Sequence, residues 1–497
     1  MSADPSWKEL QHLDAAELRA LQNRLLREHV VRRLYPFSPH YRRLFDEHGI
    51  DPAEIRRVED LAELPLTSKQ DLLPSDEEPD RARAFVLQPT KALIGEHWPL
   101  AARLPLLLKA LVHGRAAVLE DLRREYRPIF TSFTTGRSAL PVAFLYTAWD
   151  MDELAESGRR LLEVLAFERD WRVLNLFPYA PHLAFWQVAQ AGLASGTFVL
   201  STGGGKVAGT EGNLRALERM QPEAVVGVPG YLYHMLREAR ARDMRLPQLR
   251  RVVLGADAVP PGFKAKLGEL LAGMGATEVS ILGTYGFTEA RMAFAECPAT
   301  DGGSSGYHLL PDRGIFELVD PATGAVLPAD ADGELVYTPL TGRGTTVFRY
   351  RTGDLVEGGI RWDPCPHCGR TLPRIGSRLH RASSYKSLAL KKIKGTLVNL
   401  EEIGQVLADD LAVEEWQVEI RKKDDDPLEV DELVLLVALR PGAAADEVRD
   451  RLRRLVMART EVSPNEVRVL ALDELLTRVG MEKEMKEKRF VDARVLQ

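Results

Sequence analysis

The sequence has little cysteine, no long apolar run and no excess of positive charge. Three cysteines among 497 residues exclude a scaffold built on disulfides, and so few are expected in a reducing, cytoplasmic setting. The apolar stretch 101–112 is interrupted by Arg103 and Lys109 and is shorter than the roughly 18 residues of a membrane-spanning helix. No secretory signal precedes it, so no membrane partner is expected.

The charge balance argues against nucleic acid as a partner. There are 66 basic and 72 acidic side chains, a formal net charge of −6, whereas phosphate backbones are normally bound by basic surfaces. Hydrophobic residues make up 45% and charged residues 28%, which is typical of globular proteins. A chain of this length can bury a sizeable core in several domains.

Strand-like and helix-like segments alternate along the middle of the chain. Such alternation is typical of a doubly wound α/β domain with a parallel sheet. The expected strands are 173–177, 197–200, 224–228, 252–254 and 279–282. The expected helices are 212–220, 231–242 and 262–274, and the region from 7 to about 45 is also helical in pattern.

Two later regions depart from this alternation. Short strands between glycines and prolines, from about 314 to 350, predict an appended β region. Helices at 400–408 and 444–457 and strands at 415–421, 432–439 and 466–470 predict a small α+β domain. Because the polar, basic segment 378–391 is interpreted as a hinge, the expected domains are a large N-terminal α/β domain, 1–377, and a small mobile C-terminal domain, 378–497.

A hydroxyl-rich turn follows an apolar segment. Its residues are Thr131, Ser132, Thr134, Thr135 and Gly136. Hydroxyl and backbone N–H groups in such a turn can hold phosphate oxygens, although the same composition occurs in ordinary loops. The glycine-rich segment 201–206 does not fit the Walker pattern and is interpreted as a mobile glycine turn.

Two other segments place an acidic residue after an expected strand. In 283–289, Tyr285 could stack on a base and Glu289 could hold the Mg²⁺ that accompanies a triphosphate. The alternative is a strand-to-helix turn that Thr288 caps. In 351–354, Asp354 could accept both hydroxyls of a ribose, or it could simply occupy a glycine turn.

All three cysteines lie in one region, with histidines near them. Cys365 and Cys368 form a C-x-x-C pair, and Cys297 and His308 precede it. Three thiolates and one imidazole suit a tetrahedral, structural Zn²⁺ site. His367 is not preferred as the fourth ligand because it lies inside the pair. The alternative is two reduced surface thiols and an unrelated buried cysteine.

In this order the segments resemble the adenylate-forming superfamily of acyl-CoA synthetases, adenylation domains and luciferases. Within it, the chain resembles phenylacetate–CoA ligase in the N-terminal segments 41–45, 49–52 and 60–69. The resemblance covers most of the chain, but residues 76–128 have no recognised counterpart.

The resemblance implies a nucleotide site and a catalytic lysine. The residues it assigns to nucleotide binding are Thr131, Ser132, Thr134, Thr135, Gly136, Gly255, Ala256, Asp257, Thr284, Tyr285, Gly286, Asp354 and Arg378. Thr288 matches a phosphate contact and Glu289 the Mg²⁺ ligand. Lys486 matches the lysine that stabilises charge growing on the phosphoryl oxygens, and Lys483 and Lys488 are rivals for that role.

Three positions depart from the family pattern. Phe133 and Met485 stand where glycine is usual, and Ser138 stands where proline is usual. A phenylalanine removes conformational freedom where backbone must approach phosphate. These changes are compatible with an altered nucleotide site, a divergent subgroup or a degraded enzyme. The retained Glu289, Asp354 and C-terminal lysine favour an active, divergent enzyme.

The implied activity is ATP-dependent conversion of a carboxylic acid to its acyl-adenylate, with release of pyrophosphate, and then transfer to a thiol. Aromatic side chains in 177–186 and 228–231 favour an aromatic acid. CoA is the expected acceptor, and a carrier protein or another nucleophile is the alternative. A non-catalytic nucleotide-binding protein on this fold is a third hypothesis. The expected cofactors are ATP, Mg²⁺, CoA and structural Zn²⁺, and the chain could form a homodimer.

Overall fold

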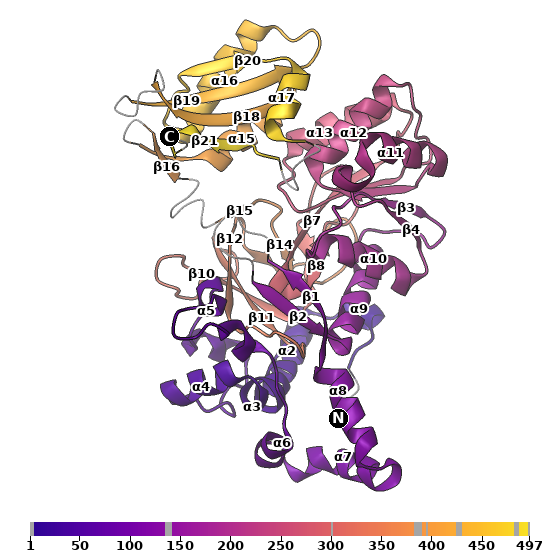
Figure 1. Cartoon of the computed structure of the whole chain (residues 1–497), viewed down its shortest axis with the longest axis vertical. Helices are drawn as coiled ribbons and strands as arrows, with labels where there is room; N and C mark the ends of the chain where they lie inside the picture. Colours follow the sequence, from indigo (N-terminus) through magenta and orange to yellow (C-terminus); the bar gives the residue numbers. More distant parts are fainter. Residues whose placement is uncertain are drawn as a thin grey trace. The chain divides into compact units, whose positions relative to one another are not determined.

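The computed structural model describes residues 4–134, 142–299, 302–381, 390–393, 396–423, 430–481 and 487–495 (Figure 1). Contacts divide the chain into two compact units. Unit 1 comprises 1–170, 180–198 and 284–377, and unit 2 comprises 171–179, 199–283 and 378–497. In the described part of the chain, no helix has the length and apolarity needed to cross a bilayer.

Unit 1 begins with a helical region, as the sequence pattern predicts. Ser6 and Asp14 each form a capping box at the start of a helix, which satisfies N–H groups that the first turn leaves unpaired. Buried Leu18, Leu26 and Phe45 anchor the helices. Their bounds are α1 Trp7–Leu10, α2 Ala15–His29, a π-helical turn Val30–Leu34, α3 Tyr35–Phe37 and α4 Pro39–His48.

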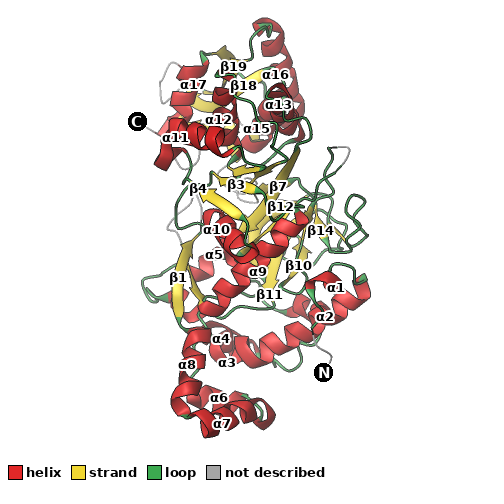
Figure 2. Ribbon diagram, turned by 90° about the vertical axis from the view of Figure 1, so that its right-hand side faces the viewer, coloured by secondary structure: helices red, strands yellow, loops and turns green. Residues whose placement is uncertain are grey.

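The segment without a recognised counterpart is also helical. It contains α6 Lys91–His97, α7 Leu100–His113 and α8 Arg115–Tyr126, after a short α5 Lys69–Leu72. Figures 1 and 2 both show α6 and α7 at the end of unit 1 that is remote from its strands. The hairpin β1 Pro128–Phe133 and β2 Ala143–Thr147 follows, and then α9 Ala148–Val164 and α10 Leu183–Ser195.

The rest of unit 1 is antiparallel. The expected β region is present as β10 Gly314–Val319, β11 Gly333–Pro339 and β12 Tyr350–Val356, each paired with the next. Thr284–Phe287 of β7 (Ser280–Phe287) pair with β8 Met292–Ala295. Further pairing adds β9 Tyr307–His308, β14 Arg374–Ile375 and β13 Ile360–Arg361.

Unit 2 contains the predicted parallel sheet, which confirms the fold class. The strands are β3 Arg172–Asn175, β4 Phe198–Ser201, β5 Ala224–Gly227, β6 Arg251–Leu254 and the first half of β7, in the order β4-β3-β5-β6-β7. The helices that alternate with them are α11 Gly205–Met220, α12 Pro229–Ala241 and α13 Pro261–Gly273. Buried Leu174, Leu232, Val252 and Leu267 lie in their shared core.

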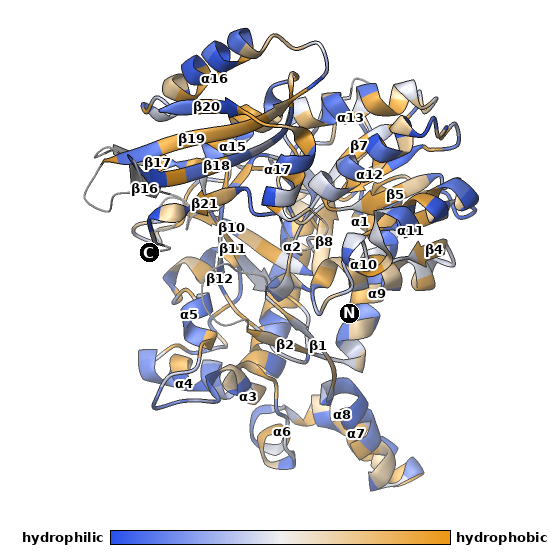
Figure 3. Ribbon diagram, turned by 45° about the horizontal axis from the view of Figure 1, so that its top comes forward, coloured by the Kyte–Doolittle hydropathy of each residue, from blue (hydrophilic) through white to orange (hydrophobic). Residues whose placement is uncertain are grey.

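The C-terminal part of unit 2 has a four-stranded sheet in the order β20-β19-β18-β21. Figure 3 shows that β19, its longest buried run, is strongly hydrophobic. The elements are β15 Leu379–Arg381, β16 Leu390–Ile393, β17 Thr396–Asn399, α15 Leu400–Asp409, β18 Val413–Lys422, β19 Asp431–Leu439, α16 Ala445–Thr460, β20 Glu466–Val469, α17 Leu472–Val479 and β21 Phe490–Asp492. Lys266 of α13 donates to the carbonyl of Val413 over 2.7 Å, so the parallel layer and this sheet are in contact.

Candidate active site

The β1–β2 hairpin holds both ends of the expected phosphate loop. The N–H of Thr134 donates to the carbonyl of Val142 over 3.0 Å, and the N–H of Val142 donates to Thr134 Oγ1 over 3.1 Å. Thr131 and Ser132 lie on β1, and the Ser132 hydroxyl is buried against Tyr146. Thr135, Gly136 and Ser138 lie outside the described residues.

Phe133 lies in strand β1 and does not adopt a left-handed backbone conformation. Its N–H donates to the carbonyl of Pro181 over 2.7 Å. Its own carbonyl accepts from the Thr288 hydroxyl at 3.3 Å and faces His182 Nδ1 at 3.1 Å. Since extended backbone is open to any residue, a side chain at this position does not strain the loop.

Two tyrosine–carboxylate hydrogen bonds join the segments that carry the metal and ribose candidates. The Tyr285 hydroxyl donates to Asp354 Oδ2 over 2.8 Å, and the Tyr350 hydroxyl donates to Glu289 Oε1 over 2.6 Å. Tyr285 lies on β7 and Glu289 on the turn that follows it, whereas both partners, Asp354 and Tyr350, lie on β12. The arrangement places Tyr285 in direct contact with Asp354 and ties Glu289 to the same strand, β12.

The turn that carries Glu289 is fixed by a buried ion pair. Thr288–Ala290 form a 3₁₀ turn, and Arg291 follows in a left-handed conformation with φ of 57°. Arg291 donates to Asp150 over 2.8 Å. Asp150 is 1% exposed and also accepts from the N–H groups of Thr147, Arg343 and Gly344 at 2.9, 3.0 and 2.8 Å.

Thr284 and Gly286 lie on β7 beside this turn, opposite Ala295 and Ala293 of β8. A Cβ at Gly286 would come within 3.1 Å of the Ala293 side chain, which is closer than usual packing allows. The glycine therefore permits the close approach of β7 and β8 that sets the position of Tyr285.

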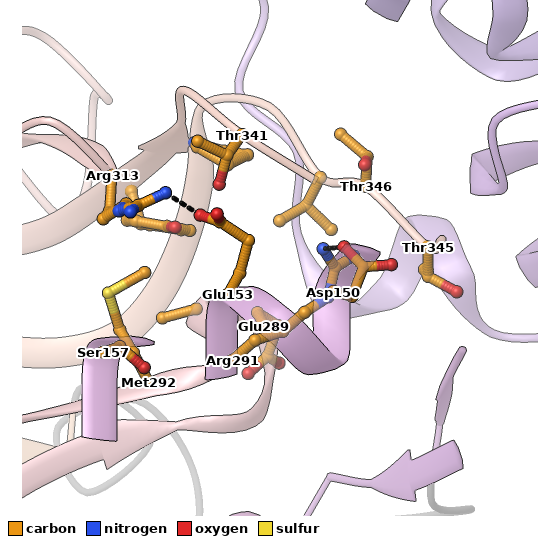
Figure 4. Close-up of a pocket in the computed structure, with 14 residues that line it drawn as sticks. Asp150, Glu153, Ser157, Glu289, Arg291, Met292, Arg313, Thr341, Thr345 and Thr346 are labelled. Carbon is orange, nitrogen blue, oxygen red and sulfur yellow. Dashed lines mark hydrogen bonds and ion pairs between the residues drawn. The ribbon is translucent and has the colours of Figure 1, made fainter. Parts of the chain in front are cut away.

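A small pocket beside the Glu289 turn is lined in part by Glu289, Arg291 and Arg313 (Figure 4). Its charged walls pair with one another: Arg313 with Glu153, and Arg291 with Asp150. Neutralised walls of this kind offer little to an anionic nucleotide. We therefore interpret the cavity as support for the turn rather than as the substrate site.

The remaining nucleotide candidates lie in unit 2. Gly255 is buried after β6, and its N–H donates to the carbonyl of Gly227 over 3.2 Å. Ala256 has φ of 68°, a costly conformation for a residue with a Cβ, and Asp257 beside it is exposed. Arg378 is exposed just before β15.

Lys486 and Lys483 lie outside the described residues, but the residues that follow Lys486 are firmly held. Arg489 pairs with Glu415 and lies 4.8 Å from the ring centroid of Trp416. Glu487 is 7% exposed, and burial raises its pKa against the opposing effect of Arg489. The lysine segment therefore continues into a strongly anchored stretch of unit 2.

Glu487 also connects the lysine segment with two other unit 2 segments. A Cβ at Gly230 would meet the Glu487 carboxylate, and Asp257 is close enough to contribute to the raised pKa of Glu487. Gly230 belongs to the segment 228–231 in which an acyl pocket was expected. The exposed Lys488, the described rival of Lys486, has its N–H bonded to the carbonyl of Val479 over 2.9 Å.

The four expected metal ligands meet in unit 1. One ligand atom from each of Cys297, His308, Cys365 and Cys368 lies within 4.8 Å of the others. The Sγ atoms of Cys297 and Cys365 are 3.6 Å apart, and Cys368 Sγ is 3.6 Å from His308 Nε2. His308 comes from β9, which β14 and β8 hold from both sides.

The electrostatics of this cluster favour thiolates at two of its three cysteines. Burial opposes ionisation of Cys365, but hydrogen bonds from His308 and Ser305 lower its pKa to about 6. Contact with Cys297 and His308 lowers the pKa of Cys368, whereas contact with Cys368 and burial raise that of Cys297. A dication placed among these sulfur atoms would stabilise all three as thiolates.

A sequence model of the family described as AMP-binding enzyme matches residues 128–348. The chain is 29% identical to a phenylacetate–coenzyme A ligase of Thermus thermophilus over 424 residues, 84% of this chain and 81% of that one. It is 25% identical to the corresponding ligase of Escherichia coli over 345 residues, 69% of this chain and 67% of that one.

A solved structure has the same fold. It is 2-hydroxyisobutyryl-CoA ligase in the postadenylation state in complex with an acyl-AMP, R3-HIB-AMP, with a TM-score of 0.74, 19% identity, and coverage of 100% of this chain and 94% of that one. The matched family model supports an adenylate-forming enzyme, and the shared fold agrees with it. Within that superfamily, the chain is similar to the phenylacetate–CoA ligases.

Sequence reasoning missed two supporting residues, Tyr350 and Asp150. A signal for Tyr350 is present, because it precedes Asp354 by four residues just as Tyr285 precedes Glu289. Asp150 gives no comparable signal, because its role arises from loops that meet only in the fold.

Proposed function

We propose that the chain activates a carboxylic acid with ATP and passes the acyl group to CoA. A carboxylate oxygen attacks the α-phosphorus, the bond to the β-phosphate breaks, and acyl-AMP and pyrophosphate form. The thiol sulfur of CoA then attacks the acyl carbon, loses its proton, and AMP leaves. The observation that carries this proposal is the pair of hydrogen bonds by which β12 and Tyr285 hold Asp354 and Glu289 on neighbouring segments.

Glu289 is proposed as the ligand of Mg²⁺. A carboxylate on a fixed turn fits the oxygen ligands that this ion prefers, and Tyr350 orients it through one oxygen atom. When bound, the ion neutralises charge on the phosphates. Thr131, Ser132, Thr134 and Thr288 keep their proposed phosphate contacts.

The other assignments also stay proposals. Tyr285 would stack on adenine, Asp354 would bind ribose, and Lys486 would stabilise charge on the α-phosphate. The remaining candidates for the nucleotide site are Thr135, Gly136, Gly255, Ala256, Asp257, Thr284, Gly286 and Arg378. The proposed domains are 1–377 and 378–497, and the proposed setting is the cytoplasm.

We propose an aromatic acid as substrate, because the curated relatives are phenylacetate–CoA ligases. The test is ATP–pyrophosphate exchange with phenylacetate, benzoate and fatty acids, followed by assay of acyl-CoA. Exchange with an arylacetate and CoA-dependent release of AMP are expected. Exchange without CoA consumption would favour a carrier-protein acceptor. Tight ATP binding without any exchange would refute catalysis.

We propose a structural Zn²⁺ held by Cys297, His308, Cys365 and Cys368, supported by the proximity of their ligand atoms. The ion would hold β8, β9 and the C-x-x-C turn together. Metal analysis of the purified protein should find about one zinc per chain. Cys365→Ser should lose the metal and lower the unfolding temperature. A zinc-free, equally stable wild-type protein would refute the proposal.

A further inference from the structure

Helix α7 exposes its apolar face instead of burying it. The large side chains on this face are exposed as follows: Leu100 65%, Leu104 50%, Leu107 55%, Leu108 53%, Leu111 83% and Val112 72%. Their spacing of three or four residues places them on one side of the helix. Of the charged residues of α7, Lys109 lies on the other side of the helix, and Arg103 lies at the edge of the apolar face, three residues after Leu100.

The opposite side of α7 is less exposed, and two side chains of α7 anchor the helix. Lys109 pairs with Asp121 of α8, and Arg103 donates to the carbonyl of Gly95 over 3.1 Å. Neighbouring Trp98 donates to the carbonyl of Arg32 over 2.8 Å. Because these contacts hold this side of α7 inward, the leucines on the other side stay exposed in unit 1.

Trp98 also belongs to a core that fixes this region. Leu93, Ile94 and Leu122 pack with it against a buried cluster formed by Phe37, Leu87 and Tyr126. The region 91–127 is therefore attached at α6 and α8, whereas α7 itself has no buried residue. Figures 1 and 2 agree in placing α7 at the remote end of unit 1.

The net charge of the region around α7 is opposite in sign to that of the whole chain. Residues 91–127 contain seven Lys or Arg and four Asp or Glu, a net charge of +3, whereas the chain carries −6. Helix α7 itself contains no acidic residue. A leucine-rich face with basic flanks is the pattern of helices that lie in the plane of a lipid interface.

We propose that α7 docks this protein onto an anionic lipid surface. The exposed leucines would enter the boundary between headgroups and acyl chains, and the basic flanks would face anionic headgroups. A second copy of the chain is a poorer occupant, because a two-fold contact would bring two segments of charge +3 together. The expectation of no membrane partner came from the lack of a spanning helix, and a helix in the surface plane does not need that length.

The test is co-sedimentation of the full chain with vesicles of phosphatidylcholine, alone or with about 30% phosphatidylglycerol. Binding to the anionic vesicles is expected, with loss in about 0.5 M NaCl. The variant Leu107→Glu/Leu111→Glu should bind at least roughly tenfold more weakly. The matched control is Leu193→Glu on α10, a leucine that is 78% exposed outside this face, which should bind like the wild type.

The oligomeric state of each variant is measured by light scattering, and its activity by pyrophosphate exchange. Unchanged exchange in the α7 variant would show that the chain is folded, and vesicle binding is read independently of the proposed activity. The proposal is overturned if no vesicle binds, or if Leu193→Glu weakens binding as much as the α7 variant. It is equally overturned if the wild type is a dimer that the α7 variant separates while neither binds vesicles.

Discussion

Replacement of Tyr350 by phenylalanine is the most direct test of how the carboxylate of Glu289 is positioned. Tyr350 is 3% exposed, and its hydroxyl donates to Glu289 Oε1 over 2.6 Å. The substitution removes only the hydroxyl, so the ring should keep its packing. The carboxylate would then lose the donor that fixes one oxygen atom and thereby directs the other.

The size of the effect follows from the kind of bond lost. A hydrogen bond to a charged group contributes about 1.5–3 kcal/mol, and about 1.4 kcal/mol corresponds to a factor of ten in rate or affinity. We therefore expect exchange to fall by roughly 10- to 100-fold at limiting Mg²⁺. Part of the loss should be recovered at high Mg²⁺, because the ion itself can order a misaligned ligand.

The assay is ATP–pyrophosphate exchange over a range of Mg²⁺ concentrations. The matched control is Tyr285→Phe, which removes the neighbouring hydrogen bond to Asp354 and should raise the KM for ATP with little change in Mg²⁺ dependence. If Tyr350→Phe leaves the Mg²⁺ dependence of the wild type unchanged while Glu289→Gln abolishes exchange, the positioning role is wrong.

Three other predictions concern charges. Lys486→Ala should cripple exchange and leave the unfolding temperature unchanged, and near-normal exchange would refute the lysine assignment. Asp150→Asn should lower the free energy of unfolding by about 3 kcal/mol, because it leaves Arg291 as a buried charge without its partner; an unchanged urea midpoint would contradict this. Burial lowers the pKa of Lys266 to about 8, so below pH 8 the protonated amine is buried at full cost in the folded chain. Between about pH 8 and 10.5 the folded state loses this proton before the unfolded state does, so stability against urea should rise with pH, and Lys266→Met should remove that rise.

The parts of the fold that the sequence predicted well have strong local patterns. The parallel strands of unit 2 are short apolar runs, and β10 was expected at the same bounds, 314–319. Helix α17 was missed because its eight residues give too little periodicity to distinguish a helix from a loop. The α6–α8 region was missed because α7 has its apolar face outward, so the usual inference from periodicity to burial fails there.

The residues of the candidate site likewise divide into those with a local sequence pattern and those without one. Glu289 and Asp354 could be proposed because each lies in a recognisable segment, although Asp354 was expected after a strand and lies within β12. The cysteine cluster could be proposed because thiols are few and two of them are close in sequence. Asp150 is different, since it collects donors from residues nearly two hundred positions away, and no local pattern encodes such a contact.

Phe133 was the strongest sequence argument against catalysis, and the geometry weakens it. A glycine is needed in a phosphate loop where φ is positive or where backbone touches the ligand. Phe133 lies in β1, and its N–H and carbonyl are already bonded to Pro181 and Thr288. Its peptide groups are therefore committed to holding the loop and are not needed for the proposed phosphate contacts. A position that contributes only backbone hydrogen bonds to the loop can tolerate a substitution if those bonds remain. A phenylalanine there is therefore compatible with an active enzyme.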